Sequence, residues 1–332
     1  MRSRQEPCVR RSSPMGRAHA GARRAACALG YALLSVGSPW AACAAEPSAP
    51  SGGMEGARSV VYRQVGSTEL RLYLFMPTNA VPTTSRSAIV FFFGGGWRGG
   101  SVAQFRPQAE RLAARGMVAI CAEYRVYSRH GATIRDCVED AKSAIRWVRA
   151  HAVELGVVTN RIVAAGGSAG GHLAACTGIV PGFEAPDEDL RISSRPDALV
   201  LFNPVCVLAP VPDIFTEGTL RLNELAQRAG TNLVALSPYH HVAPGQPPCL
   251  IFHGRADEVV PYRTAELFAE AMMHAGNTCR LVGFDGRGHG FFNPNRDGGR
   301  WFEETYRQME EFLERLGFLP QRSGPVAPTN PT

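Results

Sequence analysis

The chain has 332 residues, 45% of them hydrophobic and 19% charged, and a formal net charge of +6. This composition is ordinary for a globular protein and leaves room for one large domain or two small ones. Residues 1–45 hold seven of the 35 basic residues and one of the 29 acidic residues, so 28 residues of each sign remain in the rest of the chain. The net positive charge therefore comes from residues 1–45. The rest of the chain is formally neutral, and we expect no nucleic-acid partner.

Residues 1–45 have the parts of a secretory signal peptide. Arg23 and Arg24 provide a positive n-region, residues 25–36 a short apolar core, and residues 42–45 small side chains for cleavage. The apolar run is too short to span a membrane, and no other stretch is long enough. We therefore expect an exported protein, periplasmic or extracellular, without a stable membrane span. The alternative for this segment is a disordered basic tail.

The strand signals begin after residues 46–58, whose Pro, Ser and Gly content predicts a linker. Residues 60–65 and 70–75 flank a Gly-Ser-Thr turn and predict an opening antiparallel hairpin. Six later apolar runs lack polar alternation, which is typical of parallel strands covered by helices on both faces. These runs are 88–93, 117–122, 162–165, 198–202, 249–252 and 279–284.

Helical periodicity fills the gaps between these strands. The clearest apolar faces lie within residues 134–148, 265–272 and 302–316. Alternating strands and helices over residues 59–319 predict a single α/β domain, with a mostly parallel central sheet, an antiparallel N-terminal hairpin and helices on both faces. Residues 320–332 are rich in small and polar residues and are predicted to be a disordered tail.

The run Gly-Gly-Ser-Ala-Gly-Gly at residues 166–171 lies between a predicted strand and a predicted helix. Strand, Gly-x-Ser-x-Gly and helix together form a nucleophile elbow. Strand and helix pass so closely there that the residues two before and two after the serine must lack bulk, and Gly166 and Gly170 meet that need. Ser168 is therefore the predicted nucleophile.

A nucleophilic serine needs a histidine base, and the histidine needs a carboxylate that fixes its tautomer. In α/β folds with a nucleophile elbow the three residues come in the order Ser, acid, His, each after its own strand. Asp257 follows the predicted strand 249–252, and His289 follows the predicted strand 279–284. We therefore predict Asp257 as the acid and His289 as the base, at the same sheet edge as Ser168.

Other residues compete for these two roles, although a structural role is expected for the loop residues His240 and His241 and a surface or helix position for His130, His151 and His274. His172 lies on the nucleophile helix, cannot easily face Ser168, and is expected to pack or hydrogen-bond locally. His253 ends a strand but precedes the acid in the chain. Glu258 and Asp285 are neighbours of the favoured positions.

The oxyanion formed during acyl transfer needs backbone N–H donors. The run Phe-Gly-Gly-Gly-Trp at residues 93–97 closes an early strand, and its glycines let the backbone approach a substrate. The Ala169 amide at the start of the nucleophile helix is a further donor, helped by the helix dipole. Trp97 and Phe291 are predicted to line an acyl or alcohol pocket, the alternative being that they fill space beneath the loops.

Metal and cofactor signals are missing from the sequence. No Cys-x-x-Cys or His-x-x-x-His spacing suggests a metal site, and we expect no cofactor. Export permits disulfides, but the cysteines after the leader lie mostly in apolar runs and on apolar helix faces, so buried free thiols are expected for most of them.

Four motifs in order resemble those of the α/β-hydrolase superfamily. They are Phe-Gly-Gly-Gly-Trp, Gly-Gly-Ser-Ala-Gly-Gly-His, His-Gly-x-x-Asp-x-x-Val-Pro and Gly-x-Gly-His-Gly-Phe. Within it, residues 60–319 are similar to the bacterial acetyl-esterase and feruloyl-esterase-like branch, which is related to hormone-sensitive lipases. The resemblance implies a catalytic triad and an oxyanion hole, formed respectively by Ser168, Asp257 and His289 and by Gly95, Gly96 and Ala169.

Two features depart from that branch. Phe93 stands where those esterases usually carry histidine, so any hydrogen bond from that side chain is lost. Residues 46–58 are too few for the N-terminal helical cap of hormone-sensitive-lipase relatives. The site is therefore expected to be more open, or to be covered by residues 207–239 instead.

The function that these residues predict is a secreted serine carboxylesterase acting on short acyl esters, with a small-molecule or polysaccharide substrate such as acetylated or feruloylated carbohydrate. Two alternatives stay open. A prolyl-oligopeptidase-type peptidase shares the core, although the chain has no room for a propeller domain. A non-catalytic binding protein on the same fold is the other, although such proteins typically lack triad residues. The sequence does not identify the oligomeric state.

Overall fold

The computed structural model describes residues 53–78, 86–212 and 222–321. The predicted signal peptide lies outside these residues, as do residues 46–52 of the predicted linker and 322–332 of the predicted tail. None of the helices in the described part of the chain is both long and apolar enough to cross a membrane.

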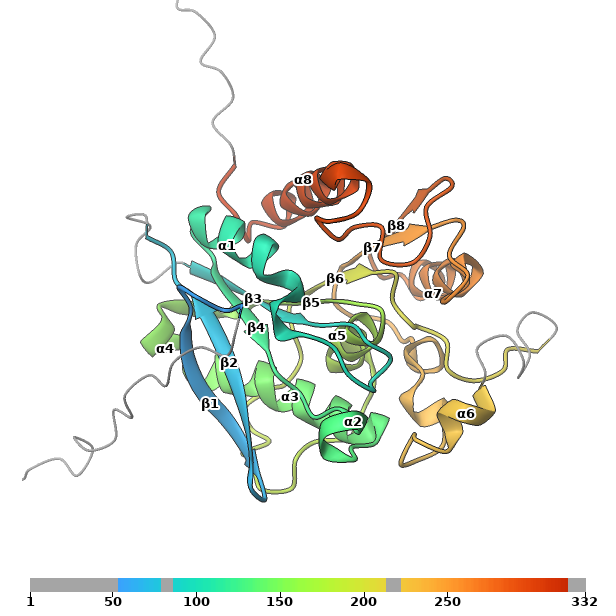
Figure 1. Ribbon diagram of the computed structural model, residues 1–332, viewed down its shortest axis with the longest axis horizontal. Helices are drawn as coiled ribbons and strands as arrows, with labels where there is room; N and C mark the ends of the chain where they lie inside the picture. Colours follow the sequence, from blue (N-terminus) through green and yellow to red (C-terminus); the bar gives the residue numbers. More distant parts are fainter. Residues whose placement is uncertain (1–52, 79–85, 213–221, 322–332) are drawn as a thin grey trace, which may run out of the picture. The chain divides into compact units, whose positions relative to one another are not determined.

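Eight strands form one sheet in the order β1-β2-β4-β3-β5-β6-β7-β8 (Figure 1). The antiparallel pairs are β1 (Arg58–Val65) with β2 (Thr68–Phe75), and β2 with β4 (Val118–Ala122). All other neighbours run parallel, which confirms the predicted mixed sheet. The remaining strands are β3 (Arg86–Phe92), β5 (Val157–Gly167), β6 (Ala198–Phe202), β7 (Cys249–Gly254) and β8 (Cys279–Phe284).

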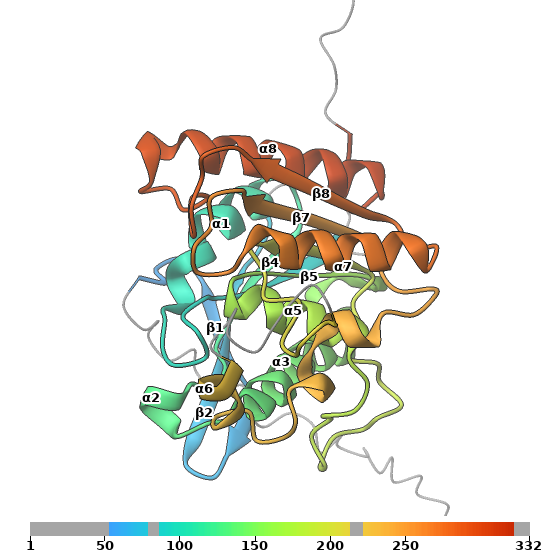
Figure 2. The ribbon, with the colours of Figure 1, turned by 90° about the vertical axis from the view of Figure 1, so that its right-hand side faces the viewer.

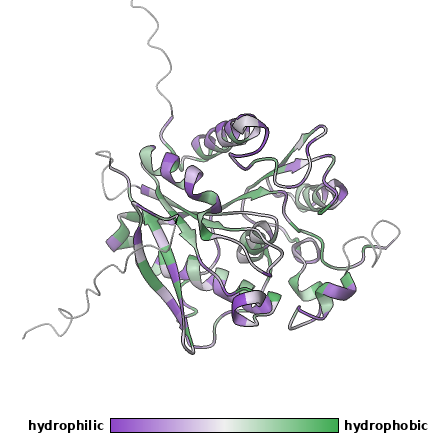
Figure 3. Cartoon of the chain, viewed as in Figure 1, coloured by the Kyte–Doolittle hydropathy of each residue, from purple (hydrophilic) through white to green (hydrophobic). Residues whose placement is uncertain are grey.

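The central strands are buried on both faces because their sequences are apolar without alternation. Every residue of β4, β6 and β7 is buried, and in β3 only the first residue is not. The outermost strand β8 is mostly half-exposed. Figure 3 shows the central strands as largely hydrophobic. A sheet of this kind needs a helical layer on each side.

Helices α1 (Arg106–Ala114) and α8 (Arg300–Arg315) cover one face of the sheet, and α3 (Ile134–Ala150), α5 (Ala169–Ile179) and α7 (Tyr262–His274) cover the other (Figures 1 and 2). The described chain also has short helices at its connections. These are η1 (Val102–Phe105), α2 (Tyr127–His130), α4 (Ala152–Leu155), α6 (Leu222–Ala226), η2 (Val234–Leu236), η3 (Pro238–His241) and η4 (Asp297–Gly299).

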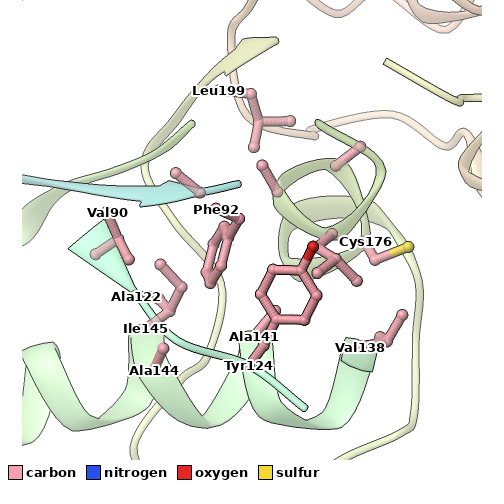
Figure 4. Packing of buried hydrophobic residues seen from close by; sticks show 14 of the residues in the cluster. Val90, Phe92, Ala122, Tyr124, Val138, Ala141, Ala144, Ile145, Cys176 and Leu199 are labelled. Carbon is pink, nitrogen blue, oxygen red and sulfur yellow. The ribbon is translucent and has the colours of Figure 1, made fainter. Parts of the chain in front are cut away.

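The core beneath α3 and α5 shows why the predicted periodicity is correct. Ala141 and Ile145 of α3 pack with Val90 and Phe92 of β3 (Figure 4). The N-terminus of α3 is fixed by a capping box between Thr133 and Asp136. All six cysteines in the described residues are free thiols, and five of them are buried, as expected for most.

The start of α5, just after the nucleophile turn, packs so tightly against the end of β3 that Gly170 has no room for a side chain. A Cβ atom there would lie 2.1 Å from the Phe92 carbonyl oxygen and 2.4 Å from that of Phe93. Both obstacles are backbone atoms, which cannot rotate away. The elbow is therefore built on close contact between α5 and the end of β3.

Gly170→Ala is expected to lower the free energy of unfolding by at least about 1–3 kcal/mol, the usual range for overpacking a rigid site. Urea unfolding measures it. Gly178→Ala on the same helix is the matched control. Its Cβ would meet only side-chain atoms, at 3.3–3.5 Å, and alanine is the better helix former. Equal stability of the two variants would contradict this tight packing.

Candidate active site

Ser168 occupies a strained turn between β5 and α5. Its backbone angles are φ 56° and ψ −119°, a combination that costs a non-glycine residue about 1–3 kcal/mol. The neighbouring strand and helix hold it there, because the Ser168 N–H donates to the Phe202 carbonyl at 2.9 Å and the His172 N–H donates to the Ser168 carbonyl at 3.0 Å. The predicted elbow is thus present in its expected setting.

His289 lies between Ser168 and Asp257 and hydrogen-bonds to both. Its Nε2 is 2.9 Å from Ser168 Oγ, and its Nδ1 is 2.8 Å from Asp257 Oδ2. An ionised carboxylate only accepts, so Nδ1 carries the hydrogen and Nε2 is left to accept from the serine hydroxyl. This is the polarity that a general base for Ser168 requires.

Asp257 is buried and held as a carboxylate by several donors. One oxygen accepts the N–H groups of Val259 and Val260 at 2.9 and 2.8 Å, and the other faces His289. Burial raises the pKa of Asp257, but the hydrogen bonds from His253, His289 and the Val260 amide outweigh it and hold the pKa far below its usual value. Asp257 therefore stays charged at any pH at which the protein is expected to work.

His253 is the residue at this site that sequence reasoning set aside. It is fully buried, and its Nε2 lies 2.8 Å from the Val260 carbonyl oxygen and 3.3 Å from Asp257 Oδ2. Both partners accept, so Nε2 donates and His253 supports the acid that it precedes. The sequence feature that could have indicated this role is the spacing His-Gly-x-x-Asp. A tight turn over these five residues brings the His253 side chain back to Asp257.

The predicted oxyanion loop, residues 93–97, lies beside Ser168. A Cβ atom on Gly94 would come within 3.3 Å of Ser168 Cβ. Gly95 and Gly96 both have positive φ angles, and a Cβ on Gly95 would lie 2.3 Å from the Gly99 carbonyl oxygen. Glycine is therefore required at position 95 by both conformation and space.

The backbone N–H groups of this loop differ in whether they already make a hydrogen bond. Gly94 N–H donates to Gln104 Oε1 at 2.7 Å. Among the hydrogen bonds of the described residues, none uses the N–H of Gly95, Gly96 or Ala169, the three predicted donors. Phe93, the departure from the esterase pattern, is buried and stacks on Tyr124 with ring centroids 4.2 Å apart.

A pocket of about 490 Å³ opens over Ser168. Gly96 and Ala169 line it with Ser168, whereas Gly95 does not. Within the described part of residues 207–239, Glu224, Leu225 and Arg228 contribute to its wall, so this segment covers part of the site. The other lining residues are Trp97, Arg98, Val205, Glu258, Val259 and Val260. A larger hollow of about 650 Å³ between β8 and α8 shares none of these residues.

The two predicted pocket aromatics have different positions. Trp97 lines the pocket, but Phe291 does not. Phe291 is buried and packs on Phe284 and Phe292, with ring centroids 4.7 and 6.1 Å apart. Its prediction as a substrate-binding residue is therefore wrong, because the aromatic core under α8 takes up its side chain.

His172 is fully buried on α5 and hydrogen-bonds locally, as expected. Its Nδ1 accepts from Trp97 Nε1 at 3.3 Å, and its Nε2 lies 2.7 Å from the Leu236 carbonyl oxygen. Burial lowers the pKa of His172 to about 4. No group of three or more His, Cys, Asp or Glu side chains within residues 53–78, 86–212 and 222–321 is arranged to hold a metal ion.

The lowered pKa of His172 predicts a pH-dependent stability. The unfolded chain binds this proton first, so the contribution is complete above the ordinary histidine pKa of 6.5 and falls as the pH drops towards 4. We expect a loss of about 2 kcal/mol in unfolding free energy between roughly pH 7.5 and pH 5. Urea unfolding of wild type and His172→Phe measures it. The difference between them should shrink by that amount at pH 5, and a constant difference would refute the assignment.

The sheet, the elbow and the hydrogen-bonded Ser-His-Asp series together define an α/β-hydrolase. The family model BD-FAE matches residues 72–272, and the chain belongs to this family. A second model, of the dienelactone hydrolase family, matches residues 234–317.

Solved structures of esterase 2 from Thermogutta terrifontis are similar to this chain. The apo form is 54% identical with a TM-score of 0.77, and the alignment covers 81% of this chain and 98% of that one. A propionate-bound form is also 54% identical, with a TM-score of 0.76 and the same coverage. At this identity and coverage the similarity extends over the whole of that esterase.

Curated relatives are more distant. A probable isoprenylcysteine alpha-carbonyl methylesterase of Arabidopsis thaliana is 28% identical over 245 residues, which is 70% of this chain and 50% of that protein. The probable carboxylic ester hydrolase LipM of Mycobacterium tuberculosis is 32% identical over 193 residues, 54% of this chain and 43% of that protein. The chain thus spans about half the length of the curated relatives it matches.

Proposed function

We propose that this chain is a serine carboxylesterase that hydrolyses short-chain acyl esters through an acyl-enzyme. The observation that carries the proposal is the series of hydrogen bonds from Ser168 through His289 to Asp257, at 2.9 and 2.8 Å, beneath a pocket lined by Ser168. Relatives that are called esterases and carboxylic ester hydrolases support the reaction type.

In the first half of the reaction, Ser168 Oγ attacks the ester carbonyl carbon while His289 Nε2 takes the hydroxyl proton. The carbonyl oxygen becomes an oxyanion, which accepts hydrogen bonds from the N–H groups of Gly95, Gly96 and Ala169. His289 then gives its proton to the alcohol oxygen as the bond to the acyl carbon breaks. The acyl group is left on Ser168.

In the second half, His289 takes a proton from water, whose oxygen attacks the acyl carbon. His289 returns the proton to Ser168 Oγ when the carboxylic acid leaves. Asp257 stays ionised throughout, keeps the hydrogen on Nδ1 and stabilises the imidazolium that forms twice in the cycle. No group beyond these side chains and the backbone amides is needed.

Similar solved structures support a short acyl group. The pocket of about 490 Å³ has an apolar part, lined by Trp97, Val205, Leu225, Val259 and Val260, and a charged part, lined by Arg98, Glu224, Arg228 and Glu258. Forms of Thermogutta terrifontis esterase 2 bound to propionate and to butyrate are similar to this chain. We extend the proposal to acetylated or feruloylated carbohydrate as the natural ester, which the sequence resemblance supports.

A fluorophosphonate probe and a substrate panel test the proposed reaction. We expect the probe to label Ser168 in wild type, and p-nitrophenyl acetate to butyrate to be cleaved faster than p-nitrophenyl octanoate. Acetylated xylan and methyl ferulate test the alcohol and acyl parts. Faster cleavage of aminoacyl p-nitroanilides than of the esters would favour a peptidase. The absence of both labelling and cleavage would favour a binding protein.

We also propose that the protein is exported and that residues 1–45 are removed. The arginine-rich start, the short apolar core and the small residues before Glu46 support this proposal. N-terminal sequencing of protein recovered from the periplasm or the medium tests it. An intact leader on protein confined to the cytoplasm would contradict it.

A further inference from the structure

We propose that His172 is a positioning residue for the oxyanion loop: its neutral imidazole holds the Trp97 indole and thereby the Gly96 amide beside Ser168. The inference rests on the proposed esterase function, since it concerns the placement of an oxyanion donor. His172 does not touch the reacting atoms in the mechanism above. It is a buried titratable group that the triad leaves unused.

The tautomer of His172 follows from its partners. The indole N–H of Trp97 only donates, so the Nδ1 atom that it faces at 3.3 Å must accept. The Leu236 carbonyl only accepts, so the Nε2 atom that it faces at 2.7 Å must carry a hydrogen. The Cys176 thiol, 3.3 Å from Nε2, lies on the same helix. The pair of contacts to Trp97 and Leu236 is complete only in the neutral form.

Trp97 needs such an anchor because of its backbone. Its φ angle is +57°, in the left-handed region that L side chains rarely adopt, and it directly follows Gly96 in the chain. Its carbonyl accepts the Tyr127 N–H at 3.0 Å, and its indole meets the His172 ring edge-on with centroids 5.1 Å apart. The indole contact therefore ties this strained loop to the helix that begins at the nucleophile.

The other side of the imidazole contacts the segment that covers the pocket. Leu236 belongs to η2, in the same stretch of chain as Leu225 and Arg228 of the pocket wall. Arg228 also reaches the loop itself, with Nη1 3.4 Å from the Gly96 carbonyl oxygen. His172 thus connects the oxyanion loop to the chain segment that supplies Leu225 and Arg228 to the pocket.

His172→Phe keeps an aromatic side chain and removes both hydrogen-bonding nitrogens. We expect kcat for p-nitrophenyl acetate to fall by about 10- to 100-fold, because a displaced oxyanion donor is felt mainly in the transition state. KM should change by less than about threefold. His172→Gln, which has both a donor and an acceptor, should recover part of the lost kcat. Thr177→Val, a buried isosteric change on the same helix, is the control and should leave kcat unchanged.

A double-variant cycle separates positioning from general loosening of the fold. Trp97→Phe removes the donor, so Trp97→Phe combined with His172→Phe should cost much less than the product of the two single effects. Independent, multiplicative effects would overturn the inference, as would equal kcat in wild type and His172→Phe. If His172→Phe does not fold, His172→Leu, which also lacks both hydrogen-bonding groups, takes its place in the same cycle. Wild type without Ser168-dependent hydrolysis would instead overturn the proposed function.

Discussion

Ser168→Ala is expected to lower kcat/KM for p-nitrophenyl acetate by about 10⁴- to 10⁶-fold, the range lost when the nucleophile of a serine triad is removed. The change deletes Oγ, the atom 2.9 Å from His289 Nε2, and keeps Cβ. Alanine meets the same strained φ of 56° as serine, so the free energy of unfolding should change little. Steady-state kinetics and urea unfolding measure the two quantities.

Ser87→Ala is the matched control for this variant. Ser87 is buried in β3, and its hydroxyl has no hydrogen-bond partner among the described residues, so its loss should leave both activity and stability unchanged. Activity retained in Ser168→Ala with an intact fold would remove Ser168 as the nucleophile. A parallel loss in Ser87→Ala would show that the assay reports folding.

Asp257→Asn is expected to lower kcat by about 10⁴-fold, as the equivalent change does in a serine protease triad. The asparagine side chain keeps the shape of the carboxylate but presents an N–H₂ group that can donate to Nδ1. His289 would then carry its hydrogen on Nε2, the atom that must accept from Ser168. Loss of the negative charge would also leave the imidazolium of the reaction without its partner.

Asp285→Asn distinguishes the acid from a rival that lies four residues before His289 in the sequence. Asp285 follows β8, its side chain is 92% exposed, and it pairs with Arg255 at 3.0 Å. Exposed ion pairs contribute little, so this variant should keep wild-type kcat. A large loss in Asp285→Asn together with an active Asp257→Asn would reverse the assignment of the acid.

The sequence predicted most of the sheet because strand burial is a local signal. Unbroken apolar runs marked β3, β4, β6 and β7, and the order Ser, acid, His follows from topology alone. The glycines of the elbow also indicated a close approach of helix and strand. In the structure Gly170 faces backbone atoms of another strand. Each of these features can be predicted from residues that lie close together in the sequence.

What the sequence did not reveal depends on contacts between distant segments. Phe291 and Phe292 are neighbours in a loop, and no periodicity tells that the Phe291 ring will pack on Phe284 at the end of β8. His253 was set aside because chain order says nothing about a side chain that returns across a turn to Asp257. The partners of His172 come from two other segments, around Trp97 and Leu236, so only the folded chain brings them together.

The order of the strands has a consequence for when activity arises. Ser168, Asp257 and His289 follow β5, β7 and β8, and in the sheet these strands lie progressively nearer one edge. The base is thus attached to the outermost strand, which is also the last to be synthesised. A chain that ends or is cut before β8 lacks the proposed base and is expected to be inert. Activity therefore requires that β8 has joined the sheet.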